Sequence, residues 1–134
     1  GFDTFTGLPE AWVEFSRITH SGGFDTGGQP PRSNDARISF VKGLFQEALP
    51  GFLQGFKSAG HLLIHNDSDL YSSTLFVLTS MNEYIPAGSI VVFDEFYSVF
   101  HEFRALDDYC AAYRRRYSVL GATEGYLQVA IRIE

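Results

Sequence analysis

Residues His61 to Tyr97, HLLIHNDSDLYSSTLFVLTSMNEYIPAGSIVVFDEFY, decide the fold of this chain. Two short apolar runs in this stretch, Leu62–Ile64 and Ile90–Phe93, each lead into acidic residues. Continuous apolar runs are typical of parallel strands that are covered on both faces. Between them, apolar residues at helical spacing and a stop at Pro86–Gly88 predict a helix over 72–84. The stretch therefore predicts a strand–helix–strand unit with parallel strands.

Acidic side chains follow both predicted strands. Asp67 and Asp69 come after the first, and Asp94 and Glu95 come after the second. Open α/β sheets bind their ligands at the carboxyl ends of their strands. Four carboxylates in one crevice repel each other unless a cation or a proton offsets their charge. This edge of the sheet is therefore the candidate site for a divalent cation.

Length and composition restrict the class of protein. At 134 residues, 45% of them apolar, the chain is long enough to bury a core, and we expect one domain over residues 1–134. The net charge of −6, without a broad basic face, argues against a nucleic-acid partner. No apolar run approaches the ~20 residues that cross a bilayer, so we expect no membrane partner. The single Cys110 fits a reducing, cytoplasmic compartment.

Further elements are predicted before the central stretch. Residues 1–5 resemble the end of a strand, and residues 37–42 predict another. A short helix over 44–49 is expected to end at Pro50. The Gly-, Pro- and Ser-rich segment 16–36 is either a lid over a site or a disordered surface loop.

The last third of the chain predicts a helix and a hairpin. Residues 99–117 place Phe103, Leu106, Tyr109, Cys110 and Tyr113 on one side, as in an amphipathic helix. Residues 118–120 and 126–133 are joined by a short connection, which predicts an antiparallel hairpin at one sheet edge. The expected fold class is α/β, with a mostly parallel sheet that ends in this hairpin.

Five motifs then suggest a family. They are GFDTFTGLPE (1–10), FVKGLFQEALP (40–50), HNDSDLYSST (65–74), IVVFDEFY (90–97) and YLQVAIRIE (126–134). In order and spacing they resemble the macrocin O-methyltransferase-like family, of which DSDLYSST and FDEFY are the most specific pair. The resemblance implies a Rossmann-like sheet, S-adenosylmethionine as cofactor and a small-molecule hydroxyl as methyl acceptor.

The resemblance also implies binding residues. Asp3 would hold the ribose hydroxyls of S-adenosylmethionine, and Gly43 and Leu44 would lie near its adenine. Asp67, Asp94 and Glu95 match the acids that bind Mg²⁺ or a similar divalent cation in metal-dependent members. In those members the cation would orient the acceptor hydroxyl and lower its pKa.

Asp67, through the cation, and His101 are the candidate catalytic residues. His101 follows the second acidic pair closely enough to act as a base, although a surface position at a helix start also fits it. Asp69 is as consistent with an acid at a helix N-terminus as with a metal ligand.

The chain departs from the family pattern at two points. Asp94-Glu95 stands where several members have Asp-Asp, so Glu95 either still ligates or leaves a weaker site. The family's first strand and glycine-rich loop would precede Gly1. The chain therefore resembles a methyltransferase truncated at its N-terminus, and we expect it not to be competent alone. The strand edge left unpaired at Leu62–Ile64 predicts one of two outcomes. Either the strand over residues 37–42 slides inward to pair with residues 62–66, or the chain forms a homodimer, which the apolar surface of the 13 Phe favours.

Two other functions fit parts of the sequence. Residues 62–69 also match the opening motif of haloacid-dehalogenase-like phosphotransferases, with Asp67 as nucleophile and Asp69 as acid. Against this, Tyr71 replaces the expected Thr or Val, and no Lys or Arg occurs between positions 70 and 93. The other alternative is a non-catalytic assembly module with a methyltransferase-like fold. Cofactor binding distinguishes this module from an enzyme.

Overall fold

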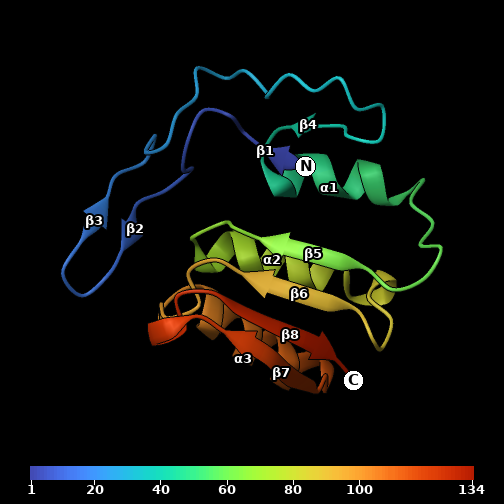
Figure 1. The fold of residues 1–134 in the computed structure, drawn as a ribbon. Helices are drawn as coiled ribbons and strands as arrows, with labels where there is room; N and C mark the ends of the chain where they lie inside the picture. The colour runs from blue at the N-terminus through green and yellow to red at the C-terminus, as the bar shows by residue number, and fades with distance from the viewer. The chain divides into compact units, whose positions relative to one another are not determined.

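The computed structural model describes all 134 residues. The contacts of the chain divide it into two compact units, Gly1–Gly55 and Phe56–Glu134. Each unit has strands and buried side chains of its own, with helix α1 in the first unit and the other helices in the second (Figure 1). The single domain expected from the sequence stays a prediction.

In the first unit, two very short strands pair in parallel. Strand β1 (Phe2–Asp3) lies beside β4 (Val41–Lys42), with Phe2 opposite Val41. We expected β4 to begin at Arg37, but the Asp35 carboxylate accepts hydrogen bonds from the backbone N–H and the guanidinium of Arg37. This local turn competes with the extended backbone, so the strand begins later.

Helix α1 (Phe45–Leu53) follows β4 and continues through Pro50, where the sequence predicted a stop. Proline inside a helix removes a hydrogen bond and crowds the preceding turn. Packing on both sides of this point offsets that cost. Leu49 and Leu53 are both buried, and the ring of Phe52 lies edge-on to Phe2 with centroids 5.0 Å apart. Tertiary contacts therefore override the local signal at Pro50.

The segment 16–36 is more regular than its composition suggested. Strand β2 (Trp12–Val13) pairs antiparallel with β3 (Ile18–Thr19), so the segment begins inside a hairpin. Further on, the backbone N–H groups of Thr26 and Gly28 both donate to the carbonyl of Phe5. These contacts hold the first half of the segment to the rest of the unit, and the lid and the disordered-loop alternatives both stay predictions.

The second unit is built on a four-stranded sheet in the order β5-β6-β8-β7. The strands are β5 (Leu63–Asn66), β6 (Ile90–Phe93), β7 (Tyr117–Ala122) and β8 (Val129–Ile133). The helices are α2 (Tyr71–Ser80) and α3 (Glu102–Tyr113), with one-turn 3₁₀ helices η1 (Asn82–Tyr84) and η2 (Glu124–Tyr126). No helix of the chain combines the length and apolar character needed to cross a membrane.

This sheet is mixed, and the expectation of a mostly parallel sheet is wrong for it. Strands β5 and β6 are parallel, as predicted, but β6–β8 and β7–β8 are antiparallel. The connection between β7 and β8 is too short for a crossover, so this pair must be antiparallel. Strand β8 lies next to β6 because its alternate side chains Val129, Ile131 and Ile133 are buried. The predicted hairpin at one sheet edge is confirmed.

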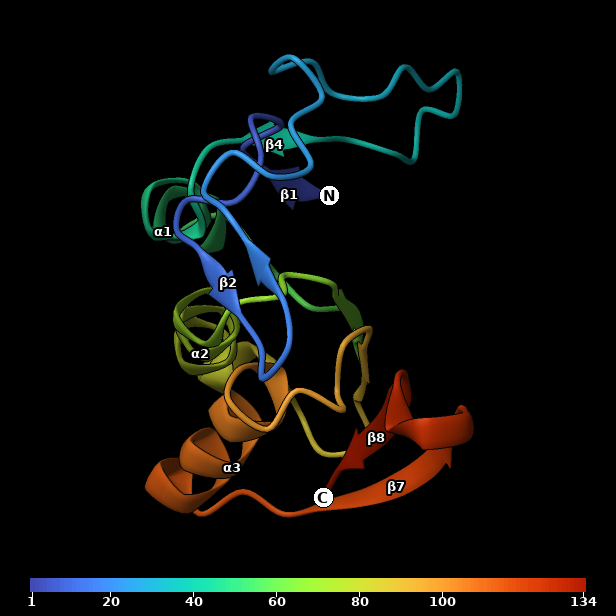
Figure 2. The ribbon, with the colours of Figure 1, turned by 90° about the vertical axis from the view of Figure 1, so that its left-hand side faces the viewer.

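Both helices of this unit cover the same face of the sheet (Figure 2). The core between them and the sheet consists of Leu78, Ile85, Val91, Phe93, Leu106, Tyr109, Val129, Ile131 and Ile133. Strand β5 is not buried on both faces as its apolar run suggested, since Leu63 is 72% exposed.

Helix α3 is amphipathic, and Leu106 and Tyr109 of the predicted face are buried, but the two ends of that face are not. Phe103 and Tyr113 are largely exposed, whereas Ala105, Leu106 and Tyr109 are fully buried. Glu102 lies on this same face and is 0% exposed. The predicted face was therefore right at Leu106 and Tyr109 and wrong at Phe103 and Tyr113, and it omitted Glu102 because a buried carboxylate is rare.

Candidate functional site

The parallel strands β5 and β6 end side by side. Their last paired residues are Asn66 and Phe93, and the N–H of Asp94 donates to the carbonyl of Asn66 at 3.1 Å. The segments that follow the two strands therefore begin next to each other. This register brings the two predicted acidic pairs to one edge of the sheet.

Three carboxylates converge at this edge. Oxygen atoms of Asp67, Asp69 and Glu95 all lie within 4.8 Å of one another. Asp67 is exposed, while Asp69 and Glu95 are partly buried. Asp69 precedes helix α2 without being its N-cap residue, and its backbone is left-handed, with φ 57°. Asp69 thus lies in the acidic cluster, and this position favours a metal ligand over an acid that caps helix α2.

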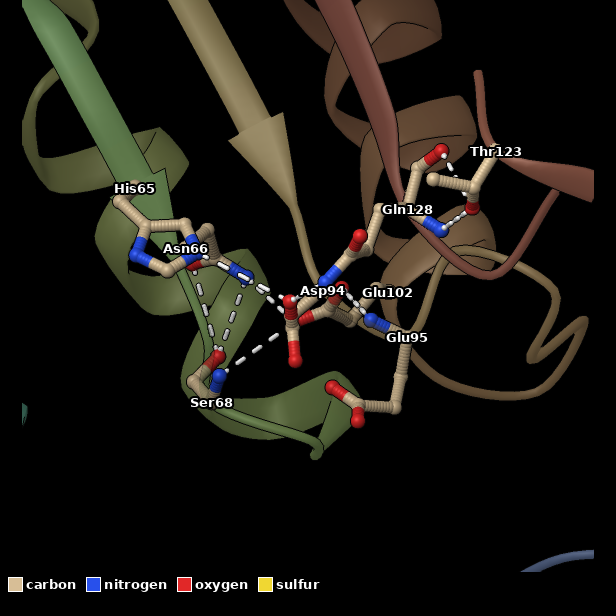
Figure 3. Close-up of polar contacts among 8 residues, drawn as sticks. All are labelled: His65, Asn66, Ser68, Asp94, Glu95, Glu102, Thr123 and Gln128. Carbon is tan, nitrogen blue, oxygen red and sulfur yellow. Dashed lines mark hydrogen bonds and ion pairs between the residues drawn. The ribbon is translucent and has the colours of Figure 1, made fainter.

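Asp94 lies at the same strand end but belongs to a different set of contacts. Its carboxylate accepts a hydrogen bond of 2.6 Å from the side chain of Gln128, and His65 Nε2 lies 3.9 Å from it. In Figure 3 the Glu95 side chain extends away from these residues. The structure thus brings Asp67 and Glu95 together with Asp69 rather than with Asp94, and the role of Asp94 as a metal ligand stays a prediction.

Burial and mutual repulsion perturb the clustered acids. Burial raises the pKa of Glu95 to about 8, and the charges of Asp69 and Asp94 add to the rise. Burial also raises the pKa of Asp69 to about 6, with the charge of Asp67 as the next cause, although a hydrogen bond with Glu95 opposes it. Both groups therefore hold protons more tightly than ordinary carboxyls do.

The cluster fits a divalent cation. Glu95 Oε2 is buried and has no hydrogen-bond partner. A buried oxygen of this kind costs free energy unless something binds it. The ligands are all carboxylate oxygens, the type that Mg²⁺ and Ca²⁺ prefer, and no cysteine or histidine belongs to the set.

Glu102 lies beneath this cluster, and sequence reasoning missed it. It accepts hydrogen bonds from the side chain of Asn66 and from the backbone N–H groups of Ser68 and Glu95. Burial raises the pKa of Glu102 to about 7, while these hydrogen bonds act in the opposite direction. Its spacing of three, four and seven residues from Ala105, Leu106 and Tyr109 was the available signal.

His101 also lies near the acids, at the N-cap position of α3. Its Nδ1 accepts a hydrogen bond of 3.3 Å from the backbone N–H of Tyr71, which orients the ring. Its charge acts on Asp69 and lowers the pKa of that carboxyl, although this is the smallest of the causes. The structure thus brings His101 close to the cluster, and its role as a base stays a prediction.

Two of the three predicted cofactor residues line a hollow in the first unit. Gly43 and Leu44 border an open space of about 510 Å³ together with Thr4, Thr6, Gly7, Leu8, Pro9, Ser21, Gly22, Lys42 and Glu47. Gly43 has φ +143°, which only glycine adopts readily, and its N–H donates to the carbonyl of Asp3. The hollow therefore lies where β1 and β4 end.

Asp3 does not line this hollow. Its Oδ1 accepts a hydrogen bond of 2.6 Å from the backbone N–H of Phe5, whose φ is 57°. Asp3 thus stabilises the turn that follows β1. Its side chain is exposed, so its predicted contact with a ribose stays a prediction.

Comparison with known families and sequences gives one match. The sequence model of a family described as Macrocin-O-methyltransferase (TylF) matches residues 32–118, which is more than half of the chain. This range contains the acidic cluster, Glu102 and His101. No curated protein sequence matches the chain.

Solved methyltransferase structures share the fold. The O-methyltransferase NovP superimposes with a TM-score of 0.64 at 18% identity, covering 98% of this chain and 57% of that one. CalS11, titled a calicheamicin methyltransferase, gives 0.67 at 23% identity, covering 98% and 58%. An apo structure of CalS11, titled TDP-rhamnose 3'-O-methyltransferase, gives 0.60 at 23%, covering 98% and 57%. The chain thus spans less than two thirds of these proteins, and at such identities the likeness shows the fold alone.

Proposed function

Because the chain belongs to the macrocin-O-methyltransferase family, we propose that it takes part in methyl transfer from S-adenosylmethionine to a hydroxyl group of a small molecule, assisted by a divalent cation. The observation that carries the metal-assisted part is the convergence of Asp67, Asp69 and Glu95 beyond two parallel strands. The family match favours methyl transfer over the phosphotransferase alternative. One of the similar structures is described as a TDP-rhamnose 3'-O-methyltransferase, so sugar hydroxyls are the first acceptors to test.

Asp67, Asp69 and Glu95 would hold the cation, with one carboxylate oxygen each. When bound, a divalent cation supplies a positive charge that orients an acceptor hydroxyl and lowers its pKa. The raised pKa values of Glu95 and Asp69 mean that the cation competes with protons for these oxygens. Cation binding near neutral pH should therefore release protons.

His101 is the proposed base for the proton of the acceptor hydroxyl. The hydrogen bond from Tyr71 to its Nδ1 fixes the orientation of the ring beside Asp69. Neutral imidazole is a suitable base near pH 7. The raised pKa of Glu95 would leave that carboxyl protonated when no cation is bound, so it is poorly suited to this role.

The hollow at the ends of β1 and β4 is the proposed site for the adenosine part of S-adenosylmethionine, which supplies the methyl group when it is bound. Gly43 and Leu44 would contact the adenine, and Asp3 would turn its carboxylate to the ribose. The proposal includes a cytoplasmic location, supported by the single free Cys110.

Calorimetric titration with Mg²⁺ tests the metal site. We expect the wild-type chain to bind and to release protons at pH 7, and Glu95→Gln to bind at least about tenfold more weakly. Asp107→Asn is the matched control, because it removes one exposed carboxylate of α3 outside the cluster. Equal affinities in wild type and Glu95→Gln would show that the cluster does not bind the cation.

Methyl transfer is tested with S-adenosylmethionine and nucleotide-linked sugars, with and without EDTA. Transfer that falls on chelation supports metal assistance, and transfer that persists unchanged contradicts it. Equilibrium dialysis with S-adenosylmethionine tests the alternative of a non-catalytic assembly module. A chain that binds neither cofactor nor cation would be the non-catalytic module.

A further inference from the structure

Glu102 is a carboxylate that helix α3 buries completely. It is the first residue of the helix and is 0% exposed, on the same face as the core residues Leu106 and Tyr109. Burying an ionisable group is costly unless hydrogen bonds satisfy it. The family-based roles and the acidic cluster of Asp67, Asp69 and Glu95 leave this residue without a function.

The two oxygens of Glu102 contact two different segments of the chain (Figure 3). Oε1 accepts hydrogen bonds from the Asn66 side chain at 2.8 Å and from the Ser68 N–H at 3.3 Å. Oε2 accepts a hydrogen bond of 3.0 Å from the N–H of Glu95. One carboxylate therefore joins the segment after β5 to the segment after β6.

This bridge lies where the sheet no longer connects the two segments. The ladder between β5 and β6 ends with the hydrogen bond from Asp94 to Asn66. Ser68 lies between Asp67 and Asp69 in the sequence, and Glu95 is itself the third member of the cluster. The spacing of the clustered carboxylates thus depends on groups that Glu102 holds.

We propose that Glu102 is a positioning residue, which holds the segments after β5 and β6 at the separation that lets Asp67, Asp69 and Glu95 bind one divalent cation. The inference rests on the metal site of the proposed function. It assigns the cation no contact with Glu102, whose oxygens already accept from the protein.

Only a carboxylate can make all three contacts, because each partner is a donor. Glutamine has the same shape but one acceptor oxygen and one NH₂ group. Its oxygen would keep the side with two donors, Asn66 and Ser68. Its NH₂ group would then face the N–H of Glu95, donor against donor. Glu102→Gln should therefore release the segment after β6 and leave the segment after β5 in place.

Amide hydrogen exchange in the metal-free protein tests this asymmetry. We expect the Glu95 amide to exchange at least about tenfold faster in Glu102→Gln than in wild type, as for a lost hydrogen bond to a charged group. The Ser68 amide should change little. A merely structural role would accelerate both amides alike or neither, and either result would overturn the proposal. If the variant does not fold, slow exchange of Glu95 in wild type supports the bridge and fast exchange overturns it.

Mg²⁺ titration of the same proteins tests the consequence. Changing a residue that orients metal ligands typically lowers affinity by about 10–100-fold, and we expect this range for Glu102→Gln at a temperature where it is folded. Asp107→Asn should bind as wild type does. If wild type binds and Glu102→Gln binds equally well, the positioning role is wrong while the metal site stands. If wild type itself does not bind, the proposed metal site is wrong, and the positioning role is overturned with it.

Discussion

The acidic cluster in the second unit and the hollow in the first both lie where two parallel strands end, but they are held in different ways. At the cluster, the buried Glu102 carboxylate accepts hydrogen bonds from Asn66 and Ser68, 36 and 34 residues before it, and from Glu95, 7 residues before it. At the hollow, Asp3 contacts a backbone two residues away, and Gly43 supplies an unusual backbone angle. The cluster thus depends on a buried side chain, whereas the hollow depends on backbone contacts, namely a local turn and the pairing of β1 with β4. A substitution should therefore perturb the two sites to different degrees.

The largest difference is expected between Glu102→Ala and Asp3→Ala. Glu102→Ala leaves the Ser68 and Glu95 amides without their acceptor inside the protein, and we expect the free energy of unfolding to fall by about 2–4 kcal/mol. Asp3→Ala removes one exposed turn contact and should cost less than about 1 kcal/mol. Denaturant unfolding of both variants measures the two values. Similar losses would remove the distinction between the two sites.

For glycine substitutions, we expect the larger loss of stability in the first unit rather than in the second. Gly43→Ala places a side chain at φ +143°, and we expect a loss of about 1–3 kcal/mol from backbone strain alone, since its Cβ would make only ordinary contacts, with Ala48 at 3.5 Å and Glu47 at 4.0 Å. Gly121→Ala in β7 is the matched control, because nothing lies within 4 Å of its Cβ and its φ is not positive. It should change stability little. Thermal unfolding of both proteins makes the comparison, and an unaffected Gly43→Ala would show that this turn is not strained.

The pH dependence should also separate the units. Glu95 binds its proton more tightly in the folded chain, with a pKa of about 8, than in the unfolded chain, near 4.5. Stability from this residue is therefore greatest below about pH 4.5 and falls as pH rises to about 8. In the first unit, Arg37 lowers the pKa of Asp35, so its small stabilisation is lost as pH falls.

Thermal unfolding between pH 5 and 9 checks the sign of the Glu95 effect. Glu95→Gln should flatten the decline, and saturating Mg²⁺ should do the same because the cation replaces the proton. A stability that rises through this range in the metal-free wild type would contradict the raised pKa.

The smallest effect concerns self-association. Strand β4 pairs with β1 and not with β5, so residues 37–42 do not slide inward. Strand β5 is at one edge of its sheet, and Leu63 on it is 72% exposed, so the predicted homodimer would form at this edge. Leu63→Lys should shift sedimentation at micromolar concentration toward the monomer without changing stability. The exposed Phe15→Lys in the first unit is the control. A wild-type monomer at these concentrations would remove the dimer.

Sequence alone determined the strand–helix–strand unit and the meeting of its acids. Both conclusions depend on short-range patterns. An acid that directly follows an apolar run lies at the end of that strand, whichever strands pair with it. The order of five motifs likewise indicated the family, and the family model confirms it. The sequence did not determine which of the four acids cluster, and in the structure Asp69 rather than Asp94 lies with Asp67 and Glu95.

Tertiary structure decided what depends on partners distant in sequence. The place of β8 between β6 and β7 follows from which strand buries its alternate side chains, and the continuation of α1 through Pro50 follows from the burial of Leu49 and Leu53. The orientation of Asp94 is set by Gln128, 34 residues away, and the role of Glu102 by donors on two other segments. A residue's own neighbours in sequence favour one local conformation, which tertiary packing can override, as at Pro50. Which groups satisfy a buried carboxylate is settled only when the chain has packed around it.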